Sequence, residues 1–237
     1  MKRILKGQTL LGLMISLAIS SWLLLLISAF YVSTQVQNRE ILLRLKLQAE
    51  LQRTIQLIGK DIRRAGFRAL NSGVIETNLP LFELDEQGTA IFLSQEEGAA
   101  PRSCALFFYD LDGKGCIGKG TTKYCAKNNR NTAIETTSEL FGYKLSQKMV
   151  KTKLTYQTAI PAHCKAEECR TALQQQACNP GGGWRSLLDE EEYEITKLQF
   201  DWLIEGKGMQ IQLAGNLKAH PHIKYETALV IGLWNQK

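Results

Sequence analysis

The sequence predicts an α+β protein in which a long N-terminal helix, membrane-spanning in its first half and amphipathic in its second, packs on an antiparallel β-sheet globular domain with disulfides. Three observations predict this: an uncharged stretch over residues 8–38, a helical stripe of apolar residues after it, and alternating apolar runs towards the C-terminus. The 237 residues are 44% hydrophobic and 22% charged, which is typical of folded chains. Beyond a membrane segment about one modest domain remains, so a large multidomain enzyme is excluded.

The first element is an apolar helix that is long enough to cross a membrane. Residues 8–35 carry no charge and, as a helix, exceed the roughly 30 Å hydrocarbon core of a bilayer. Lys2, Arg3 and Lys6 precede the helix, so we expect the N-terminal side in the cytoplasm and the bulk of the chain on the other side. A cleaved secretory signal is the alternative, although the apolar core is too long for one.

The second half of the helix, residues 36–67, is predicted to be amphipathic. Apolar residues recur at helical spacing along one stripe, at Leu47, Leu51, Ile55, Ile58 and Ile62. Gly66 is a stop signal, so we expect one helix from about Thr9 to about Ala65. A membrane anchor with a separate coiled-coil stalk is the alternative. The stripe needs an apolar cover in either case.

The remainder, residues 68–237, is expected to be a β-rich domain. Runs of aromatic and branched residues predict strands at 90–93, 105–109, 198–204, 209–213 and 223–231. The Gly-rich turn 205–208 joins two alternating runs, which predicts a hairpin. One face of this antiparallel meander is apolar, and the helical stripe is its expected cover.

All six cysteines follow the apolar segment, and an even number on that side predicts disulfides in an oxidising compartment. Two pairings close short loops and leave a third, namely Cys116 with Cys125, Cys164 with Cys169, and Cys104 with Cys178. Other connectivities stay open. A zinc site near His163 is the rival interpretation, but no cysteine spacing matches a structural zinc knuckle, so no metal is expected.

The sequence contains no convincing arrangement of catalytic residues. The three histidines, His163, His220 and His222, have no convincing nucleophile or acid partner, so we expect no enzyme, no catalytic residue and no cofactor. Asp110 and Asp112 open a motif that is typical of a calcium loop, but the remaining ligands do not follow. A hairpin turn is the preferred interpretation there.

A basic loop lies between Leu111 and Ile134, where Asp112 is the only acid. Its cations are Lys114, Lys119, Lys123, Lys127 and Arg130. Tyr124 lies among them, and cations with an aromatic suit phosphate contacts and base stacking. The hypothesis is weak DNA binding through Lys119, Lys123 and Lys127; the alternative is a solvated surface loop.

The segment Lys6–Ile15, KGQTLLGLMI, resembles the prepilin leader of type IV pilins and type II secretion pseudopilins. In that family a dedicated inner-membrane peptidase cuts after a glycine that ends a short basic leader, and methylates the new N-terminus. The resemblance therefore implies a leader over residues 1–7, cleavage between Gly7 and Gln8, and N-methylation of Gln8. It also implies that residues 8–35 form a transmembrane and polymerisation helix.

Three further segments are similar to minor pilins of the prepilin peptidase-dependent protein B and PilW-like group: Asp61–Phe67, Cys104–Asp110, and Cys178 with Gly183 and Trp184. The resemblance implies a minor pilin that helps initiate or cap a type IV pilus-like filament for DNA uptake, adhesion or motility. Its expected partners are other pilins and minor pilins, the prepilin peptidase and inner-membrane lipid, with the C-terminal domain in the periplasm. The alternatives are a type II secretion pseudopilin and, from another class, a membrane-anchored periplasmic sensor or binding protein.

Two positions depart from the family pattern. Gln8 stands where the family usually has Phe, and Gly12 stands where it usually has a Glu that pairs with a neighbouring subunit's terminal amine. A carboxylate in lipid is costly unless it is paired, so that pair would guide docking. A chain without it lacks a docking charge, which favours a minor, tip-proximal subunit over a major pilin. Tolerated sequence drift at this position is the alternative.

Overall fold

The computed structural model describes residues 10–70, 74, 76–83, 89–119, 124–153, 163–176, 178 and 183–235. The chain divides into two compact units, residues 1–46 and 47–237. The first unit consists, where described, of helix alone, and the second contains the end of that helix and all the strands.

Helix α1 (Leu10–Ile62) is the longest element. It ends just before the predicted Ala65, and Gly66 in the turn after it has a φ of 75°, as a glycine stop signal requires. Residues of the predicted stripe are all buried, at Leu47, Leu51, Ile55, Ile58 and Ile62. The predicted long helix and its apolar face are therefore confirmed.

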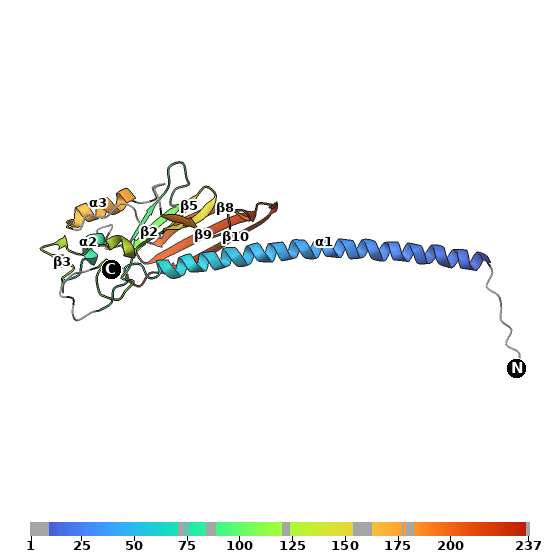
Figure 1. The fold of residues 1–237 in the computed structure, drawn as a ribbon, viewed down its shortest axis with the longest axis horizontal. Helices are drawn as coiled ribbons and strands as arrows, with labels where there is room; N and C mark the ends of the chain where they lie inside the picture. Colours follow the sequence, from blue (N-terminus) through green and yellow to red (C-terminus); the bar gives the residue numbers. More distant parts are fainter. Residues whose placement is uncertain are drawn as a thin grey trace, which may run out of the picture. The chain divides into compact units, whose positions relative to one another are not determined.

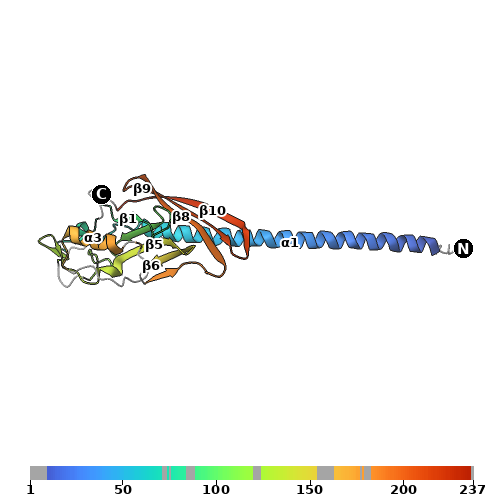
Figure 2. The same cartoon turned by 90° about the horizontal axis from the view of Figure 1, so that it is seen from above.

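A three-stranded antiparallel sheet covers that face. It consists of β8 (Tyr193–Ile204), β9 (Gly208–Leu217) and β10 (His220–Gly232), in the order β10-β9-β8. The C-terminal part of α1 lies along this sheet in both views (Figures 1 and 2), with Gly59 against Leu229 and the Gln52 side chain donating to the Tyr225 hydroxyl at 2.9 Å. The predicted hairpin, the third strand and their helical cover are confirmed.

A second, five-stranded antiparallel sheet has the order β1-β2-β5-β6-β7. Its strands are β1 (Ile91–Ser94), β2 (Cys104–Phe108), β5 (Leu140–Ser146), β6 (Met149–Lys153) and β7 (Trp184–Ser186). Strands β1 and β2 match the predicted runs to within one residue, whereas the sequence interpretation missed β5, β6 and β7. The turn between β5 and β6 has positive φ at Gln147 and Lys148, residues that give no glycine signal for a turn.

The end of the domain near the C-terminal end of α1 is built from short elements (Figure 1). They are α2 (Leu79–Phe82), β3 (Ala126–Lys127), β4 (Arg130–Asn131), the 3-10 helix η1 (Thr136–Glu139) and α3 (Ala166–Gln176). We call residues 110–139 and 163–178 the cysteine-rich end. Helix α3 was not predicted. The Glu168 carboxylate accepts a hydrogen bond from the Lys165 N–H, but Lys165 stands where the capping-box pattern has Ser or Thr, so the sequence lacks the full signal.

The six cysteines lie in three close pairs. The Cα–Cα distances are 6.2 Å for Cys104 and Cys178, 5.9 Å for Cys116 and Cys125, and 5.2 Å for Cys164 and Cys169. These are the pairs that the short-loop argument selected, and the distances suit disulfides. The first pair joins the start of β2 to the segment after α3, 74 residues away.

Candidate functional site

The N-terminal part of α1 presents an unbroken apolar surface. Over residues 10–38 it has no charged residue. Its large apolar side chains, from Leu10 to Val36, are 51–79% exposed. The most apolar 18-residue window has a mean hydropathy of 2.4, and the helix is long and apolar enough to cross a membrane. Such a surface is stable only against lipid or against other apolar helices.

Four hydroxyl groups on this surface donate hydrogen bonds within the helix. Each donates to a carbonyl three or four residues earlier: Ser16 to Leu13, Ser21 to Leu17, Ser28 to Leu24, and Thr34 to Phe30, at 2.7–2.9 Å. In hydrocarbon an unsatisfied polar group costs several kcal/mol, by order of magnitude. These internal bonds therefore let the helix carry hydroxyls in an apolar environment.

No carboxylate lies in the described part of α1 before Glu40. That residue pairs with Arg44, one turn later, at 2.7 Å. Gly12 is helical and exposed, so the position at which the resembling family carries its docking charge presents only backbone. Gly7 and Gln8 lie outside the described residues, and their cleavage and methylation stay predictions.

Carboxylates organise the loop that follows β2. One oxygen each of Asp110, Asp112 and Glu139 lies within 4.8 Å of the others. Glu139 accepts hydrogen bonds from the N–H groups of Gly118 at 2.6 Å and Leu111 at 2.8 Å, and Asp110 accepts from Gly115 at 2.7 Å. Burial raises the pKa of the Glu139 carboxyl.

This loop is not the hairpin turn that the sequence predicted. Strand β2 pairs with β1 and β5, and residues 110–118 bend irregularly around the buried Asp110 side chain instead. The sequence interpretation missed Glu139 as a member of the cluster because 27 residues separate it from Asp112. The acidic cluster holds the loop in shape by binding its backbone N–H groups.

The basic loop carries less free charge than the sequence count indicated. Lys119 forms an ion pair with Glu135 at 2.5 Å, and Lys114 forms one with Asp112 at 2.5 Å. Glu135 lies just beyond the window in which the sequence showed one acid. Lys127 is exposed on β3, and Lys123 lies outside the described residues.

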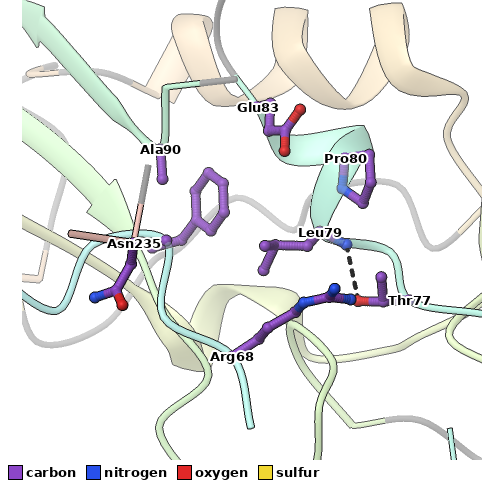
Figure 3. A pocket seen from close by; sticks show the side chains of 9 residues that line it. Arg68, Thr77, Leu79, Pro80, Glu83, Ala90 and Asn235 are labelled. Carbon is purple, nitrogen blue, oxygen red and sulfur yellow. Dashed lines mark hydrogen bonds between the residues drawn. The ribbon is translucent and has the colours of Figure 1, made fainter. Parts of the chain in front are cut away.

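A pocket of about 390 Å³ lies beside the turn after α1. Figure 3 shows Arg68 and Thr77 on one side of it and Glu83 and Pro80 across from them. The Leu79 N–H donates to the Thr77 hydroxyl at 3.3 Å. The described lining of this pocket contains no serine, cysteine or histidine. His220 and His222 stack edge to face on β10, at the other sheet.

The family described as prepilin peptidase-dependent protein B matches residues 40–233. The chain belongs to this family. An uncharacterized protein of Haemophilus influenzae is 68% identical over 237 residues, which is 100% of each chain. No solved structure matches. As a member of the prepilin peptidase-dependent protein B family, the protein is pilin-like, and the family is one of structural proteins and not a known class of enzyme.

Proposed function

We propose that this protein is a minor pilin that helps initiate or cap assembly of a type IV pilus-like filament serving DNA uptake, adhesion or motility. The exposed, uncharged helix over residues 10–38 is the observation that carries the proposal. The same helix continues into the core of the β domain through its buried stripe. An apolar helix that leads into a polar domain can exchange lipid neighbours for the helices of other subunits, as filament assembly requires.

The proposed topology follows from the same segment. Residues 1–7 form the leader, residues 8–35 cross the inner membrane once, and residues 36–67 and 68–237 lie in the periplasm. The N-terminus is cytoplasmic because its basic residues precede the apolar run. The proposed partners are the prepilin peptidase, inner-membrane lipid, and other pilins and minor pilins.

Gly12 supports a position at the filament tip. A subunit inside a filament docks below one neighbour and above another, and in the resembling family a Glu at this position neutralises a neighbour's terminal amine. This chain offers no carboxylate there, so it suits a place where no such neighbour has to be bound. A first or capping subunit has that property.

Intact-mass measurement of the membrane-extracted protein tests processing. The expected result is loss of Met1–Gly7 and gain of one methyl group, in cells with active prepilin peptidase and not in cells without it. Gly7→Leu should leave the full-length chain, whereas Gly12→Ala, a matched glycine substitution beyond the cut, should be processed normally. A full-length N-terminus in peptidase-active cells would count decisively against the pilin interpretation.

Immunogold electron microscopy tests the role in the filament. Deleting the gene should reduce the number of filaments per cell, and the wild-type gene should restore it. Label should gather at filament ends. Label spread evenly along the filaments would contradict tip location, and a defect in protein secretion with normal pili would assign the chain to a type II secretion pseudopilus.

A further inference from the structure

Within the described part of the chain, the outer edge of β10 has backbone groups without a partner strand. The Leu233 N–H donates to the Lys207 carbonyl at 2.9 Å, and these two residues continue the β9–β10 register. Since hydrogen-bonded pairs alternate in an antiparallel ladder, Thr227 and Leu229 also bond to β9. Every second residue of β10 therefore directs its N–H and C=O groups away from β9. These residues are Lys224, Glu226, Ala228 and Val230.

This edge is long, and its charged residues are Lys224 and Glu226, of which Glu226 pairs with Lys197 at 3.2 Å. Proteins usually shield edge strands by shortening them, or with prolines, bulges and charges. In β10 the proline and the register shift lie at its beginning, around Pro221, and the pairing is regular from Lys224 to Gly232. The other edge of the sheet is occupied, because the β8 N–H groups of Ile195 and Phe200 donate to carbonyls of neighbouring turns at 2.7 Å and 3.0 Å. Among the described residues, β10 pairs with β9 alone.

A groove of about 610 Å³ runs between this edge and α1. Its lining consists of Ala49, Gln52, Arg53, Ile55, Gln56, Thr227 and Ala228. Helical spacing continues the wall of the groove to Lys60 and Arg63, which are exposed. The α1 wall of the groove has three cations, Arg53, Lys60 and Arg63, and no acid, so the groove is polar and positive. Two acids of α1 lie nearby and are directed to other strands. Asp61 accepts a hydrogen bond from Tyr143 of the opposite sheet, and Glu50 lies near Tyr193 of β8, whose pKa is raised first by burial and further by this carboxylate.

We propose that the β10 edge and this groove bind an extended, acidic strand of another polypeptide. The added strand pairs its backbone with the outward groups of Lys224 to Val230 and lays alternate side chains into the groove. Main-chain hydrogen bonds supply affinity in this mode of recognition, and the side chains supply specificity. Arg53 and Lys60 make acidic side chains the favoured ones, because charge complementarity selects the partner and speeds encounter. This surface adds a lateral contact to the helix-driven assembly proposed above and does not depend on it.

Two fluorescent peptides of about ten residues test the proposal on the full-length protein in detergent micelles. One alternates Glu with Val and Thr, and the other has Lys in place of each Glu. The acidic peptide should bind, and the lysine peptide should bind at least about tenfold more weakly, since like charges oppose it. Arg53→Gln combined with Lys60→Gln should weaken binding of the acidic peptide and reduce its salt dependence, whereas Lys148→Gln, on the other sheet, should change neither.

Ala228→Pro separates backbone pairing from charge. Proline removes an N–H that points outward, and an edge strand tolerates this. The variant should keep its thermal unfolding midpoint yet bind the acidic peptide about tenfold more weakly, the order expected for a lost hydrogen bond and a steric obstruction. Ala228→Thr retains the N–H and is the matched control.

Three results would overturn the proposal: no binding of the acidic peptide, equal binding of the lysine peptide, or undiminished binding by a folded Ala228→Pro variant. Light scattering measures whether the protein associates with itself through this edge. Self-association that Ala228→Pro abolishes, without peptide binding, would assign the edge to a second copy of this chain and reject an acidic partner strand.

Discussion

The hydroxyl of Tyr143 on β5 donates a hydrogen bond to Oδ2 of Asp61 in the last turn of α1, at 2.5 Å. Burial, and then Asp61, raise the pKa of Tyr143 well above its ordinary value, so the hydroxyl remains a donor at neutral pH. On another face of the helix, Gly59 lies against Leu229 of β10. The end of α1 is therefore held by a polar contact to one sheet and an apolar contact to the other.

Removing the polar contact should destabilise the domain. Tyr143→Phe leaves the Asp61 carboxylate without this donor, and we expect a loss of about 1–3 kcal/mol in the free energy of unfolding. Tyr225→Phe removes an exposed bond to Gln52 instead, where water can replace the lost partner, and should cost less. Urea denaturation of the three proteins measures this. Equal losses for the two variants would show that the Asp61 contact has no special role.

Two glycine substitutions should differ in outcome. An alanine Cβ at Gly118 would lie 2.6 Å from the Ile134 carbonyl and 2.7 Å from the Thr136 Cα, both backbone atoms, and the φ there is +84°. Gly118→Ala should therefore cost about 2 kcal/mol or more. At Gly59 the nearest atom is the Leu229 Cδ2, which can turn away, and helix propensity favours alanine by about 1 kcal/mol.

Gly59→Ala should consequently change stability little, and thermal unfolding of both variants tests the contrast. A Gly59→Ala protein that unfolds as readily as Gly118→Ala would mean that the packing of Leu229 on α1 cannot adjust. The result would then place the helix–sheet interface, together with the acidic loop, among the least tolerant parts of the domain.

The three cysteine pairs should contribute unequally. A cross-link restrains the unfolded chain more when its loop is longer. Cys104 and Cys178 are 74 residues apart, against 5 for Cys164 and Cys169. On the loop-entropy model the first pair contributes about 4 kcal/mol and the second about 2 kcal/mol. Double alanine variants compared by urea denaturation test this order, after non-reducing peptide mapping establishes the bonds. Stoichiometric thiol labelling of the native protein would refute the disulfides.

The sequence predicts the parts of this fold that have a local signal. The stripe from Leu47 to Ile62 repeats at helical spacing, and Gly206 in the turn and Gly208 at the start of β9 mark a hairpin, so α1 and the β8–β9 hairpin could be found. Strand β5 could not, because Lys144 interrupts its apolar pattern while being only 2% exposed.

Polar partners that are distant in the sequence explain why strand β5 and the role of Glu139 could not be predicted. Lys144 is buried because it pairs with Glu96 at 3.1 Å and lies over the Trp184 ring at 4.8 Å. Glu139 joins the acidic cluster through backbone N–H groups far away in the chain. Neither partnership has a sequence period. The β10 edge is likewise visible only once the order of the strands is known.

Lys153 should make stability depend on pH. Desolvation, followed by repulsion from Lys144, lowers the pKa of the Lys153 amine to about 8. In the unfolded chain its pKa is roughly 10.4. Between these values the unfolded state binds more protons than the folded state, so the free energy of unfolding rises with pH. Below about pH 8 both states are protonated and this contribution is constant.

Urea denaturation from pH 7 to pH 9.5 measures this effect. Lys153→Gln should reduce the rise in stability relative to the wild type, because it removes the titrating amine. Lys207→Gln, at the exposed β8–β9 turn, should leave the rise unchanged. Identical profiles for wild type and Lys153→Gln would show that the pKa of the Lys153 amine is the same in the folded and unfolded protein.

The basic loop is predicted to bind DNA weakly, and its ion pairs indicate which lysines contribute most. Replacing Lys119, Lys123 and Lys127 together with alanine should lower affinity for double-stranded DNA and reduce its salt dependence, because each lost phosphate contact lowers the slope by about one. Lys127→Ala alone should cost more than Lys119→Ala, since Glu135 already neutralises Lys119. Glu135→Gln should strengthen binding, whereas Lys148→Ala, which removes a surface charge in the β5–β6 turn, should have little effect. Fluorescence anisotropy of the full-length protein in micelles, from low to physiological salt, distinguishes these cases. No binding at low salt, or an unchanged triple variant, would leave the loop as a solvated surface that keeps the domain soluble.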